Sequence, residues 1–255
     1  MGRMAEPDKP ATSMRSLERA IDILEVFDSS QHALRLTEIA RRAGLPVATT
    51  QRILGVLEAR GRVERDAGGY RPGVGLIFGA HAYLTTSPML IAARPVLQDL
   101  AAATNLTASL FKRIGWSRVV LARVEGATPL RYELPIGERL PLHLGAGKAL
   151  AAQMADDQLS EFLDRLDSHT RADGSTVNRD DFLAELKIIR ERGYSQARGE
   201  REPGMASVTA PVPDPNGVTA AVQVTGTFTD LPEERVPALG VEVQRAALAI
   251  ARRTP

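Results

Sequence analysis

Residues 36–72 read LTEIARRAGLPVATTQRILGVLEARGRVERDAGGYRP, and this stretch decides the fold of the first part of the chain. Thr37 begins a short helix that ends at Gly44, because glycine readily takes the left-handed conformation found after a helix C-terminus. A further helix begins beside Pro46, which tolerates only the first turn of a helix, and stops at Gly61. Two helices joined by a tight turn predict a helix-turn-helix.

The segments on either side complete the pattern of a small domain. Upstream, apolar residues repeat at intervals of three and four from Ser16 to Phe27, which indicates one face of a helix. Downstream, RVER and GYR are short strand-like pieces joined by residues that suit a hairpin turn. This order is that of a winged helix-turn-helix, which we expect over residues 13–73, after a disordered lead-in at residues 1–12.

One face of the helix after Pro46 is expected to contact duplex DNA. Thr50, Leu54 and Leu57 give its other face an inward-packing pattern. On the outward face, Arg52 suits guanine and Gln51 suits adenine in the major groove. The first helix and the hairpin, or wing, supply side chains for phosphate or the minor groove, which position the protein. The residues expected to contact DNA are Arg15, Arg19, Thr37, Val47, Ala48, Thr49, Gln51, Arg52, Arg62, Arg65, Tyr70 and Arg71.

Beyond Pro72 the pattern changes. Residues 74–87 have a helical period and are expected to form a linker helix between two domains. From Pro88 on, helices and strands interleave and some strands are joined as hairpins, which predicts an α+β domain over residues 88–255. The strand candidates are NLTASLFKR, SRVVLARVEG, LRYELPIG and the hairpin SVTAPVPDPNGVTAAVQVTG, and the helix candidates are GAGKALAAQM, RDDFLAELKIIRERG and PEERVPALGVEVQRAALAIARR.

The composition agrees with a two-domain globular protein. Hydrophobic residues make up 44% and charged residues 25% of the 255 positions, which are ordinary values. Because no apolar run approaches the roughly 18 residues of a spanning helix, we expect a cytoplasmic protein without membrane contact. The net charge is +1 overall, and residues 1–72 hold twelve Lys and Arg against ten Asp and Glu. DNA binding is therefore predicted from the placement of the arginines and not from net charge.

Sequence motifs for catalysis fail on spacing or are absent. GAGKAL lacks the P-loop glycine five positions before Gly147, where Leu142 stands, and the Ser or Thr after Lys148. With no cysteine there is no thiolate site, and no GxSxG or HExxH pattern occurs. We expect no enzyme, cofactor or metal site, with a catalytic carboxylate pair left open. The four histidines, which are far apart in the chain, are His32, His81, His143 and His169.

The chain resembles the IclR family of bacterial transcriptional regulators from about Ser16 to Arg252. The resemblance is carried, in order, by SLERAIDILEVF, LTEIARRAGLP, TQRILGVLEARGRVERD, GYRPGVGLIFGA, GAGKALAA, ELKIIRERGYS, EPGMASVTAPVPDPNG and AAVQVTG. It implies a GAF-like α/β effector domain joined by a linker helix to the winged helix-turn-helix. It also implies dimers made through the DNA-binding half and tetramers (dimers of dimers) made through the effector half, with a palindromic double-stranded operator as partner.

The same resemblance implies an effector site beside the start of the GAGKA segment, where backbone amides would face a carboxylate of the ligand. Two departures from the family pattern stand out. QARGE at residues 196–200 replaces an acidic stretch, so the acidic pocket residue carried there is expected to be missing. His143 lies one residue nearer the glycines than the family's usual histidine, so a core or surface role stays open for it. The residues expected at the effector site are His143, Gly145, Ala146, Ser207, Gln223 and Thr225.

These features together predict a ligand-responsive repressor of a catabolic operon. The effector implied by the resemblance is a small organic carboxylate, either aromatic or short aliphatic. The alternative is a sensor or interaction module that uses its winged helix for protein contacts and does not bind DNA. The modest charge of the N-terminal part keeps that alternative open.

Overall fold

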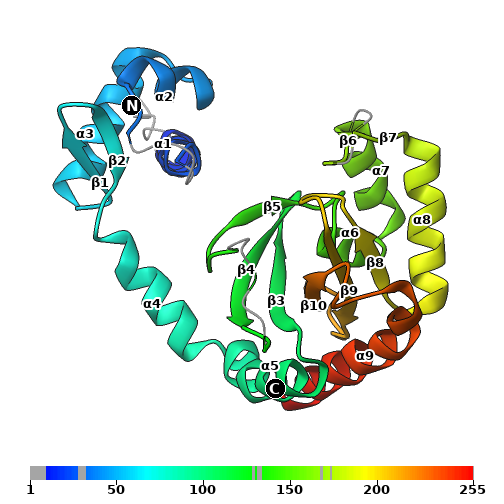
Figure 1. Ribbon diagram of the computed structural model, residues 1–255. Coiled ribbons are helices and arrows are strands. Elements are labelled where there is room, and N and C mark those ends of the chain that lie inside the picture. Colours follow the sequence, from blue (N-terminus) through cyan, green and yellow to red (C-terminus); the bar gives the residue numbers. More distant parts are fainter. Residues whose placement is uncertain are drawn as a thin grey trace, which may run out of the picture. The chain divides into compact units, whose positions relative to one another are not determined.

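A computed structural model of the chain describes residues 10–27, 33–127, 130, 134–166, 169–172 and 174–254. The chain divides into two compact units, Met1–Leu84 and Thr85–Pro255, which are described separately (Figure 1). The boundary falls in the last turn of α4, within the segment predicted to form a linker helix. Residues 1–9 of the predicted lead-in and His32 lie outside the described residues.

The N-terminal unit has the element order that the sequence predicts. Gly44 and Gly61 adopt φ values of +65° and +64°, which confirms the left-handed helix ends expected there. Thr50 and Leu54 are fully buried, so the inward face of α3 is also as predicted. The elements are α1 (Pro10–Glu25), α2 (Leu36–Arg42), α3 (Val47–Ala59), β1 (Val63–Asp66), β2 (Gly69–Pro72) and α4 (Leu76–Thr86).

A single backbone bridge fixes the wing to the rest of this unit. Leu34 and Tyr70 exchange two backbone hydrogen bonds of 2.8 and 2.9 Å, and both side chains are buried in the apolar cluster. A Cβ on Gly69 would lie 2.3 Å from the Leu34 carbonyl oxygen, so this close approach requires glycine. The bridge makes Leu34, two residues before α2, a third strand partner of the hairpin.

The start of α1 differs from the sequence prediction. The helix begins at Pro10, so the assignment of Pro10–Thr12 to a disordered lead-in is wrong. Proline fits the first turn of a helix because its missing N–H would have no partner there. No single helix of the described chain is long and apolar enough to cross a membrane, and α4 and α5 meet that criterion only when taken together as a bent pair.

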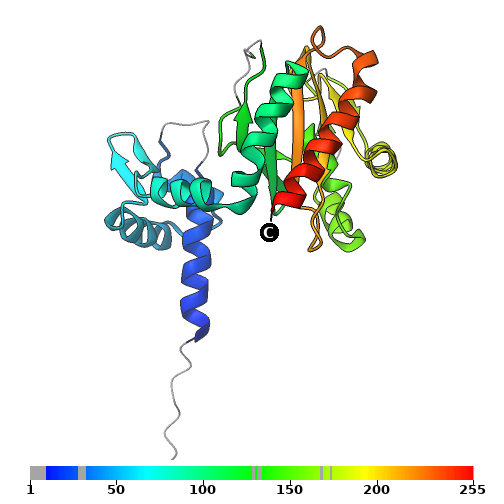
Figure 2. The ribbon, with the colours of Figure 1, turned by 90° about the horizontal axis from the view of Figure 1, so that it is seen from below.

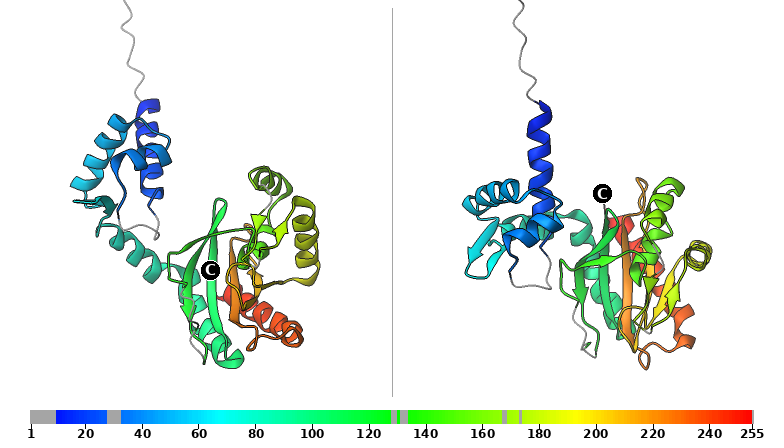
Figure 3. Two further views of the ribbon diagram at one scale, coloured as in Figure 1. Left: turned by 45° about the horizontal axis from the view of Figure 1, so that its top comes forward. Right: turned by 90° about the horizontal axis from the view of Figure 1, so that it is seen from above.

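The C-terminal unit is built on a six-stranded antiparallel sheet of order β5-β4-β3-β10-β9-β8. Helices α5 and α9 lie side by side on one face (Figure 2), α6 packs on the other face, and α8 lies beyond the β8 edge (Figure 3). The helices are α5 (Pro88–Thr104), α6 (Ala146–Ala151), α7 (Asp156–Asp164), α8 (Arg179–Arg192) and α9 (Val236–Arg253), with a short 3-10 turn at Glu233–Arg235. The strands are β3 (Thr107–Ile114), β4 (Ser117–Val124), β5 (Arg139–Pro141), β8 (Ser195–Arg198), β9 (Met205–Val212) and β10 (Ala220–Thr227), with a separate pair β6 (His169–Thr170) and β7 (Thr176–Val177).

One strand prediction in this unit is wrong. The segment LRYELPIG at residues 130–137 was expected to be a strand, but its described residues 130 and 134–137 contain none, and the pairing strand is β5. Gly137, with φ of +92°, turns the chain, and its N–H reaches back to the carbonyl of Val120 at 2.9 Å. The other two single-strand candidates correspond to β3 and β4, and the predicted hairpin is confirmed as β9 and β10.

A β-bulge interrupts the pairing of β3 with β4. Val120 pairs with Phe111, but Ala122 pairs with Leu110, so Leu121 is an extra residue on β4. Side chains of a regular strand alternate between faces, and an extra residue reverses that alternation. Two residues of β4 on opposite sides of Leu121 in the sequence therefore face the same side of the sheet when their residue numbers differ by an odd number.

Helix α6 packs closely against the residues that precede it, and a substitution at Gly147 tests this packing. A Cβ at Gly147 would lie 2.3 Å from the Leu142 carbonyl oxygen and 2.5 Å from the Leu142 Cα. We expect Gly147→Ala to lower the free energy of unfolding by about 1–3 kcal/mol through overpacking. Urea titration followed by the fluorescence of Trp116, the single tryptophan, would measure it.

The control is Gly55→Ala on α3, where a Cβ meets nothing within 4 Å. This variant should leave the Trp116 transition unchanged, because it adds a methyl group to an open position in the other unit. Equal midpoints for Gly147→Ala and the parent protein would show that α6 does not pack as described.

Candidate functional site

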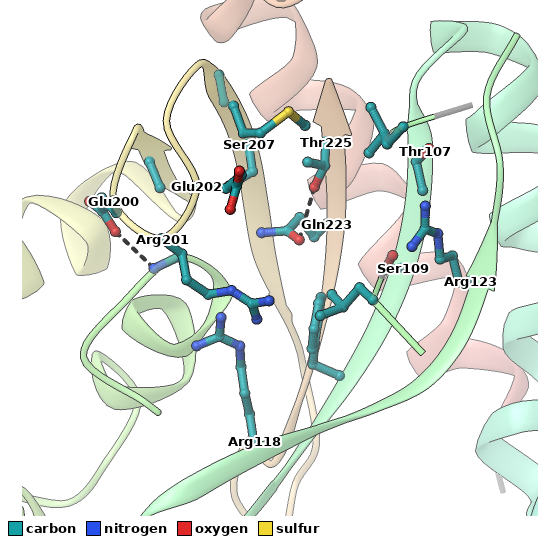
Figure 4. Close-up of a pocket in the computed structure, with 17 residues that line it drawn as sticks. Thr107, Ser109, Arg118, Arg123, Glu200, Arg201, Glu202, Ser207, Gln223 and Thr225 are labelled. Atoms are coloured by element: carbon teal, nitrogen blue, oxygen red, sulfur yellow. Dashed lines mark hydrogen bonds between the residues drawn. The ribbon is translucent and has the colours of Figure 1, made fainter. Parts of the chain in front are cut away.

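A pocket opens on the face of the sheet that carries α6, and it encloses about 640 Å³ of empty space, part of which is open to solvent (Figure 4). Strands β3, β4, β9 and β10 form its floor, and the segment after β8 forms its wall. The lining residues are Thr107, Ser109, Phe111, Arg118, Arg123, Leu130, Leu134, Gly145, Ala197, Glu200, Arg201, Glu202, Met205, Ala206, Ser207, Gln223 and Thr225.

The floor of the pocket is polar, which is unusual for a sheet face covered by a helix. Strand register places Ser109 opposite Gln223, and Thr225 opposite both Thr107 and Ser207, so all five side chains share one face. The Thr225 hydroxyl donates to the Gln223 Oε1 atom at 3.0 Å. Because buried polar groups are retained at a cost unless they are bonded, this stripe indicates a surface built to meet a polar ligand.

The bulge at Leu121 brings two arginines of β4 into the same pocket. Arg118 and Arg123 are five residues apart and would face opposite sides of a regular strand. With the extra residue between them, Arg118 stays on the side of Phe111 and Arg123 pairs with Ser109, so both line the pocket. Figure 4 shows Arg123 beside Thr107 and Ser109, on the far side of the pocket from Arg118.

Arg118 is a buried cation without an opposing carboxylate at ion-pair distance among the described residues. Its residue exposure is 3%, one guanidinium nitrogen donates to the Pro141 and Leu144 carbonyls, and its Nε atom has no hydrogen-bond partner. Burial, and then the charge of Arg201, lower the pKa of Arg118 to about 9, against a smaller opposite effect of Glu200. Burial also lowers the pKa of Arg201, whose guanidinium points toward that of Arg118 in Figure 4.

Glu200 fastens the start of α6 to the pocket wall. One of its carboxylate oxygens accepts the Gly145 N–H at 2.8 Å, and the other accepts from the Lys148 ammonium group. Lys148 is 1% exposed and also donates to Glu185 and to the Gln196 carbonyl. The amide of Gly145, which we expected to face an effector carboxylate, is thus bonded to a carboxylate of the protein itself.

The structure separates the residues expected at the effector site. Gly145, Ser207, Gln223 and Thr225 line the pocket together, whereas Ala146 is fully buried and is not among the lining residues. His143 lines a different, open groove beside Trp116, Arg139 and Arg165, so its predicted place in the effector site does not fit the structure. Although His143 is only two residues from Gly145, its side chain lies on another side of the loop.

The charged members of the pocket are not predicted from the sequence. The expectation that the acidic residue is missing is wrong, because Glu200 is 7% exposed and lines the pocket. Arg118, Arg123 and Arg201 were not singled out either. Glu200 follows an arginine and a glycine instead of other acids, and the arginines are separated in sequence, so their meeting depends on the bulge and the sheet.

The N-terminal unit exposes most of the side chains predicted to contact DNA. On α3, Val47, Ala48, Gln51 and Arg52 are exposed and Thr49 is half-buried. Arg52 makes no ion pair with any residue that the structure describes. Arg15, Arg19, Thr37, Arg65 and Arg71 are also exposed.

One predicted DNA contact in the wing does not fit the structure. The Tyr70 side chain is 6% exposed because it packs in the apolar cluster with Leu34 and Val63. Arg62 is half-buried and donates to the Gly75 carbonyl, which ties the wing to the start of α4. Contact of Arg62 with DNA stays a prediction.

Carboxylates compensate several of the remaining cations. Glu38 accepts hydrogen bonds from Arg41 and Arg42, which hold the pKa of Glu38 down to about 2. Arg71 pairs with Glu64 at 3.1 Å, which contributes to the lowered pKa of Glu64 after the Val74 N–H bond. A phosphate at Arg71 would compete with this partner.

Known families match almost the whole chain. A model described as "Bacterial transcriptional regulator IclR C-terminal" matches residues 81–252, and a model of the "IclR helix-turn-helix domain" matches residues 16–67. The "Transcriptional repressor IclR" of Escherichia coli is 29% identical over 93% of this chain and 89% of its own length. The "HTH-type transcriptional regulator BhcR" of Paracoccus denitrificans is 34% identical over 92% and 85%.

Solved structures agree with the fold. An IclR family transcriptional regulator from Brucella abortus superposes with a TM-score of 0.80 at 25% identity, covering 94% of this chain and 93% of that one. An IclR homologue from Microbacterium hydrocarbonoxydans, solved in complex with 4-hydroxybenzoate, has a TM-score of 0.72 at 21% identity, covering 94% and 98%. At that identity the second likeness shows the fold alone.

Glu200→Gln tests the contact between the pocket wall and α6. The change keeps the shape of the side chain but leaves the buried Lys148 with Glu185 as its one carboxylate partner. We expect the free energy of unfolding to fall by about 1.5–3 kcal/mol, because one of the two charged hydrogen bonds between the buried Lys148 and a carboxylate is lost. Urea titration followed by Trp116 fluorescence would measure the loss.

The matched control is Glu202→Gln, two residues along the same pocket wall, which is half-buried. It should change stability by no more than about 0.5 kcal/mol, as is usual for side chains outside a buried network. A loss of equal size in both variants would contradict the role given to Glu200.

Proposed function

Because the chain belongs to the IclR family of bacterial transcriptional regulators, we propose that it represses a catabolic operon and responds to a small organic carboxylate. The observation that carries the proposal is the pairing of two compact units, one with an exposed helix of a helix-turn-helix and the other with a cationic pocket. The two relatives described above are transcriptional regulators, and the one from Escherichia coli is named a repressor.

The DNA-binding part of the proposal rests on the first turns of α3. Val47 through Arg52, apart from the buried Thr50, point away from the apolar cluster and are available to base edges in a major groove. Arg65 and Arg71 in the wing and Arg15 and Arg19 on α1 are exposed arginines suited to phosphate. Val47, Ala48, Thr49, Gln51 and Arg52 are the proposed base-reading set.

The effector part rests on the polar, arginine-bearing pocket of the C-terminal unit. Ser207, Gln223 and Thr225 offer hydrogen-bonding groups on its floor, and guanidinium groups offer charge to a carboxylate. A structurally similar homologue was solved with the aromatic acid 4-hydroxybenzoate, which supports an organic acid as the effector class. Such a ligand changes DNA affinity only if it binds one arrangement of the regulator better than another.

Apolar side chains on α1 and α4 support a homodimer. Leu17 on α1 is 62% exposed, Ile77 and Phe78 on α4 are 61% and 72% exposed, and α4 contains no buried residue. Large exposed apolar surfaces mark protein interfaces, and a two-fold dimer would present two α3 helices to the half-sites of a palindrome. Exposed Ile91, Val241 and Leu248 on α5 and α9 offer a second surface for a dimer of dimers.

The main test is a gel shift with the DNA upstream of the gene and its neighbours, at two salt concentrations. We expect a shift at low salt that depends on sequence and weakens as salt rises, because phosphate contacts release counterions. No shift at low salt would instead favour the alternative, a sensor or interaction module that uses the winged helix for protein contacts.

Arg52→Ala tests base reading by α3. If Arg52 bonds a guanine, the change should cost about 1–3 kcal/mol of operator binding and relax the preference at one base pair. Fluorescence anisotropy on a set of single-substituted operators would measure both. Tyr70→Phe is the control, and its affinity should not change because that ring is buried. An equal loss on every operator would make Arg52 a phosphate contact.

Phe78→Glu tests the dimer. A charge placed in the exposed apolar surface of α4 should shift the protein to monomers and weaken operator binding, since one winged helix then binds alone. Sedimentation velocity would give the oligomeric state. Ile188→Glu on α8, at a residue that is 53% exposed, is the matched control and should stay dimeric. A Phe78→Glu protein that remains a dimer would move the interface elsewhere.

A further inference from the structure

Arginines outnumber glutamates among the described residues that line the effector pocket. Three arginines and two glutamates line it, and the Lys148 ammonium group lies behind the wall and neutralises one of those carboxylates, Glu200. The other, Glu202, acts on Arg201. Among the lining residues that the structure describes, Arg118, Arg123 and Arg201 exceed the two glutamates by one positive charge, and Glu200 is already bonded to Lys148.

The two arginines of β4 line the pocket and have unmet hydrogen-bonding capacity. The Nε atom of Arg118 and two guanidinium nitrogens of Arg123 are buried with no hydrogen-bond partner. Arg123 has a 12% exposed side chain, and its contact with Glu125, 3.9 Å away, is too long for a hydrogen bond. Buried guanidinium donors without partners are costly, and an incoming anion would satisfy them.

The positive groups stand at two separate places. Arg118 and Arg201 point toward one another across one end of the pocket, whereas Arg123 lies beside Ser109 and Thr107 (Figure 4). Arg118 pairs with Arg113 and Arg123 pairs with Ser109, and these partners are four positions apart on β3. At about 3.3 Å a position, the backbones of the two arginines are roughly 13 Å apart, and their side chains reach into the pocket from there. One small anionic group does not meet both places, but the two ends of a short chain do.

A backbone amide at the start of α6 could also bind a ligand carboxylate, but the Gly145 amide is already bonded within the protein. The Gly145 N–H at the start of α6 donates to Glu200, and Lys148 holds that carboxylate in place. Recognition of charge in this pocket therefore falls to the guanidinium groups.

We propose that the pocket selects a short dicarboxylate, with one carboxylate between Arg118 and Arg201 and the other at Arg123. The hydroxyls of Thr107 and Ser109 stand at the Arg123 end, and the Gln223 amide lies on the pocket floor. Phe111 and Leu134, which also line the pocket, offer apolar contact to the methylenes. This inference rests on the proposed function of the pocket as the effector site, and it narrows the effector from an organic acid to a doubly charged one.

Isothermal titration calorimetry on the full-length protein tests the proposal. The probes are linear dicarboxylates with two, three and four methylenes, the monomethyl ester of each, benzoate and inorganic phosphate. We expect at least one dicarboxylate to bind at least about tenfold more tightly than its own monoester, because the ester loses a charged hydrogen-bond partner. Phosphate, a dianion confined to one point, should bind more weakly than that dicarboxylate.

Three variants locate the second charge. Arg123→Gln should weaken the preferred dicarboxylate by at least about tenfold and leave its monoester nearly unchanged, which removes the discrimination. Arg201→Gln should weaken both ligands. Arg113→Gln, on β3 outside the pocket lining, is the control and should change neither.

Monoesters or benzoate that bind as tightly as the dicarboxylates would overturn the proposal and leave the pocket as a site for a simple acid. The absence of binding by any probe would also overturn it. Gel shifts without ligand separate these results from the proposed function, since sequence-specific DNA binding stands or falls independently of the calorimetry.

Discussion

The Glu200 carboxylate is the contact on which the C-terminal unit depends. Helix α6 has only six residues and every one of them is buried, including the cation Lys148. A buried ammonium group is tolerated only when carboxylates and carbonyls surround it, and Glu200 supplies one of its two carboxylates. Because the same side chain also accepts the Gly145 N–H, one residue couples the start of α6, the segment after β8 and the rim of the pocket.

The positions of the charged groups in the pocket depend on the one inserted residue of β4, Leu121. Without Leu121 as a bulge, alternation along β4 would direct Arg118 and Arg123 to opposite faces of the sheet, and one of them would meet the helices α5 and α9. Bulges of this kind recur beside functional sites because they redirect a side chain without changing the strand order. The extra residue thus places both arginines of β4 on the face of the sheet that lines the pocket.

This dependence explains what could be predicted from sequence. The winged helix-turn-helix was predictable because its signals are local, as with Gly44 and Gly61 at the helix ends. In the pocket, the family resemblance predicted Gly145, Ser207, Gln223 and Thr225. The position of Glu200 depends on its hydrogen bond to Gly145, 55 positions away. The directions of the β4 arginines depend on a bulge that the sequence does not reveal. The predicted roles of His143 and Tyr70 do not fit the structure, because the position of a residue in the sequence does not determine the direction of its side chain.

The arginines of the pocket also bear on how a small ligand could act on a regulator. Arg118 carries the cost of burial and the repulsion of Arg201, and both lower its pKa. An anion that binds between them removes this repulsion, so part of its binding free energy comes from relieving strain that the protein already holds. The arrangement that places the two guanidinium groups closest together is then the one stabilised most by the ligand. Such differential binding is the physical requirement for a ligand-driven shift between arrangements with different affinity for DNA.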